Sequence, residues 1–388
     1  HTAYRRQRQM CIRDRDIIVP YDKGSNTYTA IVAPQSVAAG TAFITCTFTN
    51  GKTFVYKMKN ATDWQAGGEY TYTVSLATAR GYIIEDDGSY TVYNADGLMN
   101  IAELVNGGKT DINITLDKNI DLTGKAWTPI GTDYDNSYKG TFDGGGHTIT
   151  GLTFTTNDEF AGLFGWLNRA GTVKNVVMEG VQITSNQIYG GSIGGVVGSS
   201  WGTIENCSVS GNVSGTVYVG GVVGVQIGGS ITGCSSSATV KGTVDVGGVA
   251  GQTNSSATLT ACYATGNVII EMDPKKNIAG GSLVGMNAGS SLLACYATGN
   301  VTSTGSSTGY MHIGGFLGNN YTTVTACYWK NNHEQGIGYN RESTGATKVD
   351  GSVVTWQKAV DAMNTALQNA GSKWRYELKG ALPTLRKQ

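Results

Sequence analysis

Proline and charge are scarce in this sequence of 388 residues. It contains 5 prolines, and Asp, Glu, Lys and Arg together make up 14% of it, against about 25% charged residues in an ordinary globular chain. Scarce proline and glycines without a three-residue period exclude a collagen-like helix. No run of 18 or more apolar residues occurs, so we expect no transmembrane helix in this sequence.

Glycine and apolar residues are abundant instead. The chain has 56 glycines and 40% hydrophobic residues, where glycine averages about 7% in other proteins. The apolar residues recur in short ordered runs, which disfavours disorder. Many short β segments separated by glycine explain this pattern, so we expect an all-β fold.

The first 15 residues differ from the rest. They hold five arginines and one acid, and without them the net charge falls from zero to −4. The run RQRQMCIRDR resembles a translated sequencing adapter, so we interpret residues 1–15 as a non-native assembly artefact. A basic arm for nucleic acid or an anionic surface is the alternative. If residues 1–15 are an artefact, the native N-terminus is missing, with any signal peptide or lipidation site.

Residues 16–78 alternate apolar with polar residues in several runs, and Asn50-Gly51 lies between two of them. This dipeptide between alternating runs is a strong hairpin signal, so we predict an antiparallel β module. The segments IVAPQSVAAGTAFITCTF and WQAGGEYTYTVSL resemble the C-terminal part of fimbrillin-like surface domains of Bacteroidales. The resemblance implies a partial β-sandwich module in a pilus-associated protein.

A repeat occupies most of residues 85–332. Six variants of one glycine-rich pentapeptide have final glycines 33, 26, 27, 34 and 33 residues apart, and a second signature such as ENCSVSGNV or TACYATGNV follows each. Such a period indicates stacked structural units, and neither a leucine ladder nor helical periodicity is present. We therefore predict a right-handed parallel β-helix, with loops of variable length at 271–276 and 302–310.

The pentapeptides AGLFG, GGVVG and GGFLG resemble the GLUG repeat family. The resemblance specifies architecture more than function, because these repeats occur on varied bacterial surface proteins. Among them are adhesin-like proteins and some immunoglobulin-A-directed proteases, in which the repeats accompany a catalytic domain.

Two short amphipathic helices flank the repeat. Leu98, Ile101, Ala102 and Val105 share one helical face, with Asp96 as the expected N-cap. A second stripe runs from Trp356 to Leu367 through Ala359, Val360 and Met363. We expect the first helix to cover the first coil of the β-helix, and residues 333–388 to form a helix-strand cap over the last coil.

Five cysteines occupy one column of the repeat, namely Cys207, Cys234, Cys262, Cys295 and Cys327. Adjacent parallel strands lie about 4.8 Å apart, which keeps stacked Cβ atoms beyond the ~3.8 Å typical of a disulfide. Their spacing also lacks the close pairs of a zinc site. We therefore expect buried, reduced, inward-facing thiols.

Tyr263, Tyr296 and Tyr328 directly follow three of those cysteines. Successive strand residues point to opposite faces, so these tyrosines should form an exposed row. The row could stack on sugar rings, or it could only shield the outer face of the sheet. We take it as the candidate ligand-binding site.

Two further clusters have simpler explanations. A tight turn accounts for Asp143 and the glycines before His147 without catalysis. Asp133, Asp135 and Asn136 offer oxygen atoms, but they lack the full spacing of a calcium loop. We predict no metal and no cofactor.

Residues 190–330 contain four acids, mostly in separate coils, and no catalytic motif. Because general acid–base catalysis requires positioned titratable groups, we expect no catalytic residue and no enzyme activity, and we expect no binding of nucleic acid. Our hypothesis is a secreted or outer-surface adhesin-like or pilus-associated structural protein, presenting a β-helix to glycans, surface proteins of host or bacterium, or pilus subunits. The alternative is a fragment of a carbohydrate-active or proteolytic surface enzyme.

Overall fold

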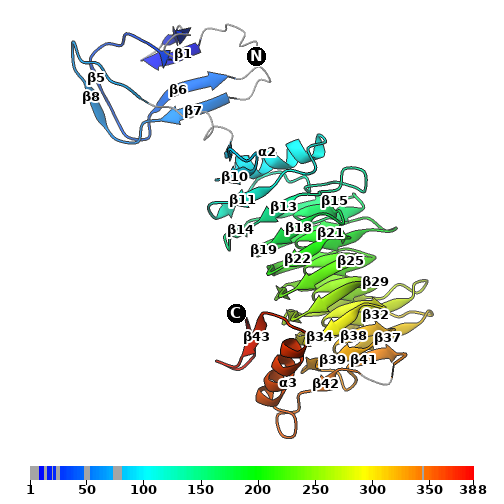
Figure 1. The fold of residues 1–388 in the computed structure, drawn as a ribbon. Coiled ribbons are helices and arrows are strands. Elements are labelled where there is room, and N and C mark those ends of the chain that lie inside the picture. Colours follow the sequence, from blue (N-terminus) through cyan, green and yellow to red (C-terminus); the bar gives the residue numbers. More distant parts are fainter. Residues whose placement is uncertain are drawn as a thin grey trace. The chain divides into compact units, whose positions relative to one another are not determined.

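The chain folds into two compact units, residues 1–80 and 81–388. This computed structural model describes residues 8–12, 15–19, 21–22, 27–47, 53–72, 81–342 and 345–388. Figure 1 shows the second unit as a stack of strands from β9 to β42 with two helices. Almost all regular structure is therefore β, as the glycine-rich pattern predicts.

The first unit consists of antiparallel strand pairs. The predicted hairpin around Asn50-Gly51 is present as the pair β6–β7, although the turn itself lies outside the described residues. The antiparallel character predicted for this region is confirmed. The pairs are β1 (Arg8–Ile12) with β2 (Arg15–Val19), β3 (Tyr21–Asp22) with β4 (Thr27–Tyr28), β5 (Gln35–Val37) with β8 (Thr62–Trp64), and β6 (Ala42–Thr47) with β7 (Thr53–Lys57).

The second unit is a parallel β-solenoid with three sheets along its length. Each coil contributes strands to the sheets, and equivalent strands of successive coils pair in parallel. The largest sheet contains β9 (Tyr82–Ile84), β10 (Tyr90–Val92), β11 (Ile114–Leu116), β13 (Thr141–Asp143), β17 (Phe164–Leu167), β18 (Thr172–Lys174), β21 (Val197–Ser200), β22 (Thr203–Glu205), β25 (Val223–Thr232), β29 (Ala250–Thr260), β33 (Val284–Ala288), β34 (Ser291–Leu293), β38 (Leu317–Asn320), β39 (Val324–Thr325) and β41 (Ile337–Asn340).

Two smaller sheets complete the coils. The second contains β12 (Ile120–Asp121), β14 (Thr148–Thr150), β15 (Thr153–Thr156), β19 (Val177–Ser185), β23 (Ser208–Ser214), β26 (Ser235–Ser236), β27 (Thr239–Gly242), β30 (Tyr263–Ala264), β31 (Val268–Glu271), β35 (Tyr296–Ala297), β36 (Val301–Thr304), β40 (Tyr328–Trp329) and β42 (Thr347–Lys348). The third contains β16 (Phe160–Ala161), β20 (Ser192–Gly194), β24 (Tyr218–Gly220), β28 (Asp245–Gly247), β32 (Ile278–Gly281) and β37 (Met311–Gly314).

In-register apolar side chains fill the interior. One column passes through eight consecutive paired strands, and every member is at most 4% exposed. Equal register keeps each side chain against its counterpart one coil away, about 4.8 Å distant, so the core is continuous along the axis. Its members are Ile114, Phe142, Val173, Ile204, Ile231, Leu259, Leu292 and Val324.

The last glycine of the pentapeptide sits where two backbones nearly touch. A Cβ on Gly224 would lie 2.4 Å from the backbone nitrogen of Ile193, and one on Gly251 would lie 2.5 Å from that of Val219. Real Cβ atoms are not found so close to backbone, so these positions require glycine. The repeated motif is therefore explained by the close approach of strands of the largest sheet, β25 and β29, to third-sheet strands of the preceding coil, β20 and β24.

Helix α2 (Ala95–Asn106) covers the start of the solenoid. Its buried residues Leu98, Ile101, Ala102 and Val105 join the solenoid core, as predicted from their spacing. The N-cap prediction was wrong: Asn94 caps the helix, because its side chain accepts a hydrogen bond from the N–H of Gly97. Asp96 lies in the first turn and pairs with Lys125 at 2.8 Å.

Helix α3 (Trp356–Asn369) and the hairpin β43 (Trp374–Glu377)–β44 (Thr384–Lys387) lie on the side of the solenoid (Figure 1). The predicted stripe is buried, but it packs against Ala261, Ala294 and Tyr296 of successive coils. The expected cap over the last coil was therefore wrong for α3, which covers an outer flank.

Candidate functional site

The residue before each column cysteine turns the chain with positive φ. The angles are 52° at Asn206, 66° at Gly233, 54° at Ala261, 52° at Ala294 and 49° at Ala326, and Asn175 before Val176, one coil earlier, has 55°. Residues other than glycine and asparagine seldom adopt this left-handed region. Every coil nevertheless repeats it, so the turn is imposed by the solenoid and defines a corner that runs along its axis.

The C-terminal helix and hairpin cover part of the corner, at Gly233, Ala261 and Ala294. A Cβ on Gly233 would lie 2.3 Å from Cζ2 of Trp374, so only glycine fits there. Ala261 and Ala294 are fully buried in the cluster formed with α3 and the hairpin, and the Tyr376 hydroxyl donates to the Ala294 carbonyl at 3.0 Å. Asparagine occurs only where the corner is uncovered.

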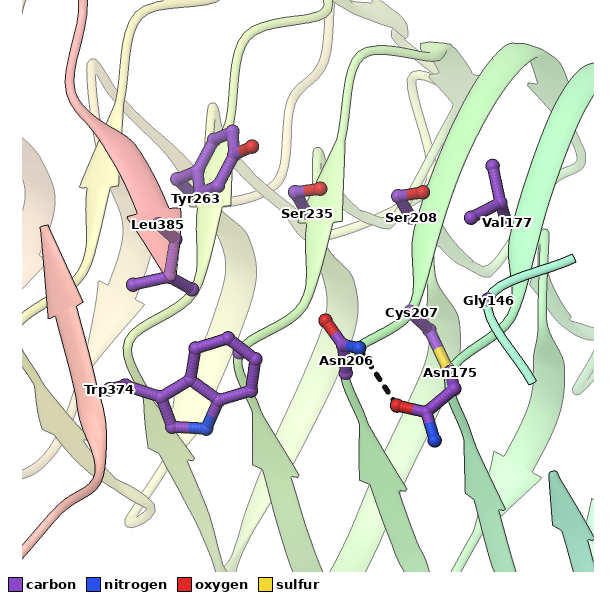
Figure 2. Close-up of a pocket in the computed structure, with 11 residues that line it drawn as sticks. Gly146, Asn175, Val177, Asn206, Cys207, Ser208, Ser235, Tyr263, Trp374 and Leu385 are labelled. Carbon is purple, nitrogen blue, oxygen red and sulfur yellow. Dashed lines mark hydrogen bonds between the residues drawn. The ribbon is translucent and has the colours of Figure 1, made fainter. Parts of the chain in front are cut away.

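A groove of about 210 Å³ lies where the covered corner meets the uncovered corner. We call it the corner groove. Figure 2 shows Tyr263, Ser235 and Ser208 in a row along one side, and Trp374 and Asn206 on the other. The lining residues are Gly146, Asn175, Val177, Asn206, Cys207, Ser208, Gly233, Ser235, Tyr263, Trp374 and Leu385.

Side-chain amides form a ladder at the open end. Asn206 Nδ2 donates to Asn175 Oδ1 at 2.8 Å, and Asn175 Nδ2 donates to Asp143 Oδ1 at 2.9 Å. Burial tends to raise the pKa of Asp143. The hydrogen bonds from Asn175 and Gly145 and the ammonium of Lys174, 3.2 Å away, together hold that pKa below its usual value. Asp143 is therefore ionised, and its carboxylate is held by hydrogen bonds and by the ion pair with Lys174.

The second carboxylate near the groove is also paired. Glu205 forms an ion pair with Lys387 of β44, whose ammonium lies 5.8 Å from the centre of the Trp374 ring. Each carboxylate at the rim thus has a cation beside it, and the rim carries no net charge from these two pairs.

Several polar groups in the groove are free to bind a ligand. Within the described part of the chain, the hydroxyls of Ser208 and Ser235 form no hydrogen bond. Both serines are half-buried. The groove therefore combines unused hydrogen-bonding groups with apolar surface from Tyr263, Trp374 and Leu385.

The prediction that Tyr263, Tyr296 and Tyr328 form an exposed row was wrong. Tyr296 is 1% exposed, and its hydroxyl donates to the Pro383 carbonyl at 2.6 Å. Tyr263 and Tyr328 are half-buried. The strand alternation correctly turned these side chains outward, but α3 and the hairpin return to cover them. Tyr263 alone reaches the corner groove, where its ring stacks on Tyr296 at 4.9 Å with 2° between the planes.

The cysteine prediction is confirmed. Cys207, Cys234, Cys262, Cys295 and Cys327 are buried and free of disulfides. Each sulfur faces the interior, and Cys234 Sγ accepts a weak hydrogen bond from the Cys207 N–H at 3.4 Å. Burial raises the pKa of the Cys234, Cys262 and Cys327 thiols, so they are unreactive fillers of the core.

The two simpler interpretations concern Asp143 and Asp133. The segment before His147 is a turn, in which the Gly145 N–H donates to Asp143 Oδ1 at 2.9 Å. The Asp133 carboxylate accepts hydrogen bonds from Asn136 and Thr132. Among the described residues, no group of three or more His, Cys, Asp and Glu could hold a metal ion.

Sequence reasoning missed the residues from the C-terminal hairpin. Trp374 and Leu385 line the groove, yet they lie more than 100 residues from the corner they cover. The change from asparagine to glycine to alanine before successive cysteines is the one sequence signal that could have located the covered region.

A separate exposed aromatic group lies at the predicted loop 302–310, where Tyr310 is 73% exposed and stacks with His312 at 6.0 Å between ring centres.

Comparison with known families identifies both parts of the chain. Residues 11–92 match the fimbrillin-like family model, and residues 189–214 and 215–241 match the GLUG motif. The chain joins a fimbrillin-like segment to GLUG repeats. The fimbrillin-like match extends past residue 80 into β9 and β10, which pair within the solenoid.

Two curated proteins are similar to part of this chain. Halomucin of Haloquadratum walsbyi is 31% identical over 209 residues, which is 48% of this chain and 2% of halomucin. The "Putative Gly-rich membrane protein" of Evansella cellulosilytica is 33% identical over 129 residues, 31% of this chain and 14% of that protein. The chain thus spans a small part of either relative.

The GLUG-containing solenoid also has a counterpart among solved structures. A "putative immunoglobulin A1 protease" from Bacteroides ovatus superposes with a TM-score of 0.55 and 18% identity, covering 78% of this chain and 93% of that one. At this identity the likeness shows a shared fold. In the described part of the chain, no helix is long and apolar enough to cross a membrane.

Proposed function

We propose that this chain belongs to an adhesin-like protein of the bacterial surface, in which the solenoid presents a binding groove. The observation that carries the proposal is the corner groove, with free hydroxyls beside an aromatic ring. The fimbrillin-like segment and the GLUG repeats support a surface location, as do relatives named as a mucin and a membrane protein.

A binding role without catalysis agrees with the charges at the groove. The carboxylates nearest to it, Asp143 and Glu205, are each held by a lysine. General acid–base catalysis requires groups that exchange protons with a substrate, and ion-paired carboxylates are poorly suited to that. The enzyme alternative draws its support from the immunoglobulin A1 protease assignment of the Bacteroides ovatus structure.

Adhesion can be tested with beads that carry the purified chain. We expect the beads to bind mucin-coated surfaces or epithelial cells above albumin-coated beads, measured by counting bound beads under flow. The same preparation incubated with immunoglobulin A1 and with polysaccharides should release no fragments. Absence of adhesion to mucin, host cells and bacterial cells would contradict the adhesin proposal, and cleaved products would establish the enzyme alternative.

A further inference from the structure

The aromatic stack on the outer flank ends inside the corner groove. Tyr263 and Tyr296 stack face to face, in register on β30 and β35. In the coil on the N-terminal side, the register partner of Tyr263 is Ser235, and in the coil before that the register partner of Ser235 is Ser208. Serine is too small to cover an aromatic ring, so the face of Tyr263 directed toward Ser235 lacks a stacked neighbour.

The space beside Tyr263 has the dimensions of one more ring. Adjacent coils repeat at about 4.8 Å, close to the 4.9 Å between the Tyr263 and Tyr296 rings. The groove of about 210 Å³ lies at this position, over Ser235 and Ser208 (Figure 2). This volume is below the ~300–1,000 Å³ of pockets that enclose a drug-sized ligand, so it suits a single ring.

The edges of the space are polar and uncharged. Ser208 and Ser235 offer hydroxyls that both donate and accept. The Asn206 side chain is exposed, and its Oδ1 accepts no hydrogen bond from the described residues. The nearby charges are already paired with each other.

We propose that the corner groove binds a pyranose ring of a neutral glycan, stacked on Tyr263 and hydrogen-bonded by Ser235, Ser208 and Asn206, with Trp374 as an apolar wall. A pyranose has an apolar face of C–H groups and a rim of hydroxyls, which matches an aromatic face surrounded by neutral donors and acceptors. An anionic sugar would meet no free cation here. The inference rests on the proposed binding function and names its ligand class.

Substitution at Ser235 gives the sharpest test. Ser235→Tyr should place a ring against Tyr263, as Tyr263 itself lies against Tyr296, and so fill the site without disturbing the fold. Ser235→Ala removes only the hydroxyl. With cellotetraose, mannotetraose and chitotetraose as probes, titration calorimetry and saturation-transfer NMR should show loss of binding in Ser235→Tyr and about a threefold to fivefold weaker binding in Ser235→Ala.

Two further variants test the walls of the groove. Tyr263→Ala should weaken binding by about tenfold or more, because it removes the stacking face. Asn206→Ala should weaken it about threefold to fivefold, and the backbone tolerates alanine because three other coils use alanine at this corner. The matched control is Asn212→Ala, since Asn212 bonds Gln182 at 3.0 Å between the same two coils outside the groove.

The outcomes separate this inference from the proposed function. Neutral tetrasaccharide binding that survives Ser235→Tyr would overturn the inference, as would a preference for trigalacturonic acid or for the peptide Gly-Tyr-Gly. Loss of binding in Tyr310→Ala alone would move the site to the loops. If the beads still adhere while no neutral glycan binds, the glycan assignment fails and the adhesin proposal stands. If neither occurs, both fail.

Discussion

At the scale of single residues, one carboxyl group is buried without a polar partner among the described residues. Asp245 on β28 is 5% exposed, and its side chain forms no hydrogen bond with the described residues. Burial raises its pKa from 3.8 to about 7. An unpaired buried anion is unfavourable, so folding favours the protonated form of this residue.

The stability of the protein should therefore depend on Asp245 with a defined sign. Because its folded pKa lies above its unfolded pKa, the native state holds more protons between pH 4 and 7, and its stability falls as pH rises through that window. Asp245→Asn should remove this loss, so that its stabilising effect is about 2–3 kcal/mol larger at pH 8 than at pH 5. Urea unfolding at both pH values measures it.

A matched substitution controls for the general effect of removing a negative charge. Asp158→Asn alters an exposed carboxyl on a loop of the same solenoid and should show no such difference. An equal gain for Asp245→Asn at pH 5 and pH 8 would contradict the raised pKa.

At the scale of elements, the C-terminal helix and hairpin act as a lateral cover. Trp356, Met363 and Leu367 of α3 pack on the outer flank, and none of them belongs to the core inside the coils. The hydrogen bonds from Tyr296 to Pro383 and from Tyr376 to Ala294 fix the hairpin on the same flank. The corner groove exists only while this cover is docked.

Removing a buried side chain from α3 should release the cover and leave the coils intact. Met363 is fully buried, and Met363→Ala should destabilise docking by about 2–5 kcal/mol. Limited proteolysis read by mass spectrometry should show faster cleavage within residues 350–388, with the far-UV β signal retained. Thr365→Ala, an exposed change on the same helix, should behave as wild type. Loss of the β signal in Met363→Ala would show that the cover supports the coils.

At the scale of the whole molecule, the solenoid has a hydrophobic core of its own. Among the described residues, this core begins at Tyr82 and includes none of 1–80. In a solenoid, each coil is stabilised by itself and its neighbours. The stability of residues 81–388 should therefore not require the fimbrillin-like unit.

A fragment of residues 81–388 should keep the main unfolding transition of the full chain. We expect the midpoint of thermal unfolding, followed by circular dichroism, to agree within ~2 °C, because the shift caused by 1 kcal/mol falls with chain length and is already only about 2–4 °C for 150–250 residues. A drop of ten degrees or more in the fragment would show that the first unit stabilises the solenoid.

The local features of this protein were determined by its sequence alone. Repeat spacing predicted the parallel stacking of coils, and strand alternation placed the column cysteines inside. Helical spacing predicted the buried faces of α2 and α3. These features depend on residues that are close in the chain or that occupy equivalent positions of the repeat. The spacing of residues in the sequence therefore suffices to predict them.

Which outward faces are covered follows from long-range packing. Strand alternation predicts an exposed side chain at Tyr296, yet its hydroxyl donates to the carbonyl of Pro383, 87 residues later. Trp374 forms a wall of the corner groove by packing on Gly233. The position at which a C-terminal segment docks is determined by shape complementarity across the fold, and residues so far apart share no period that the sequence could display.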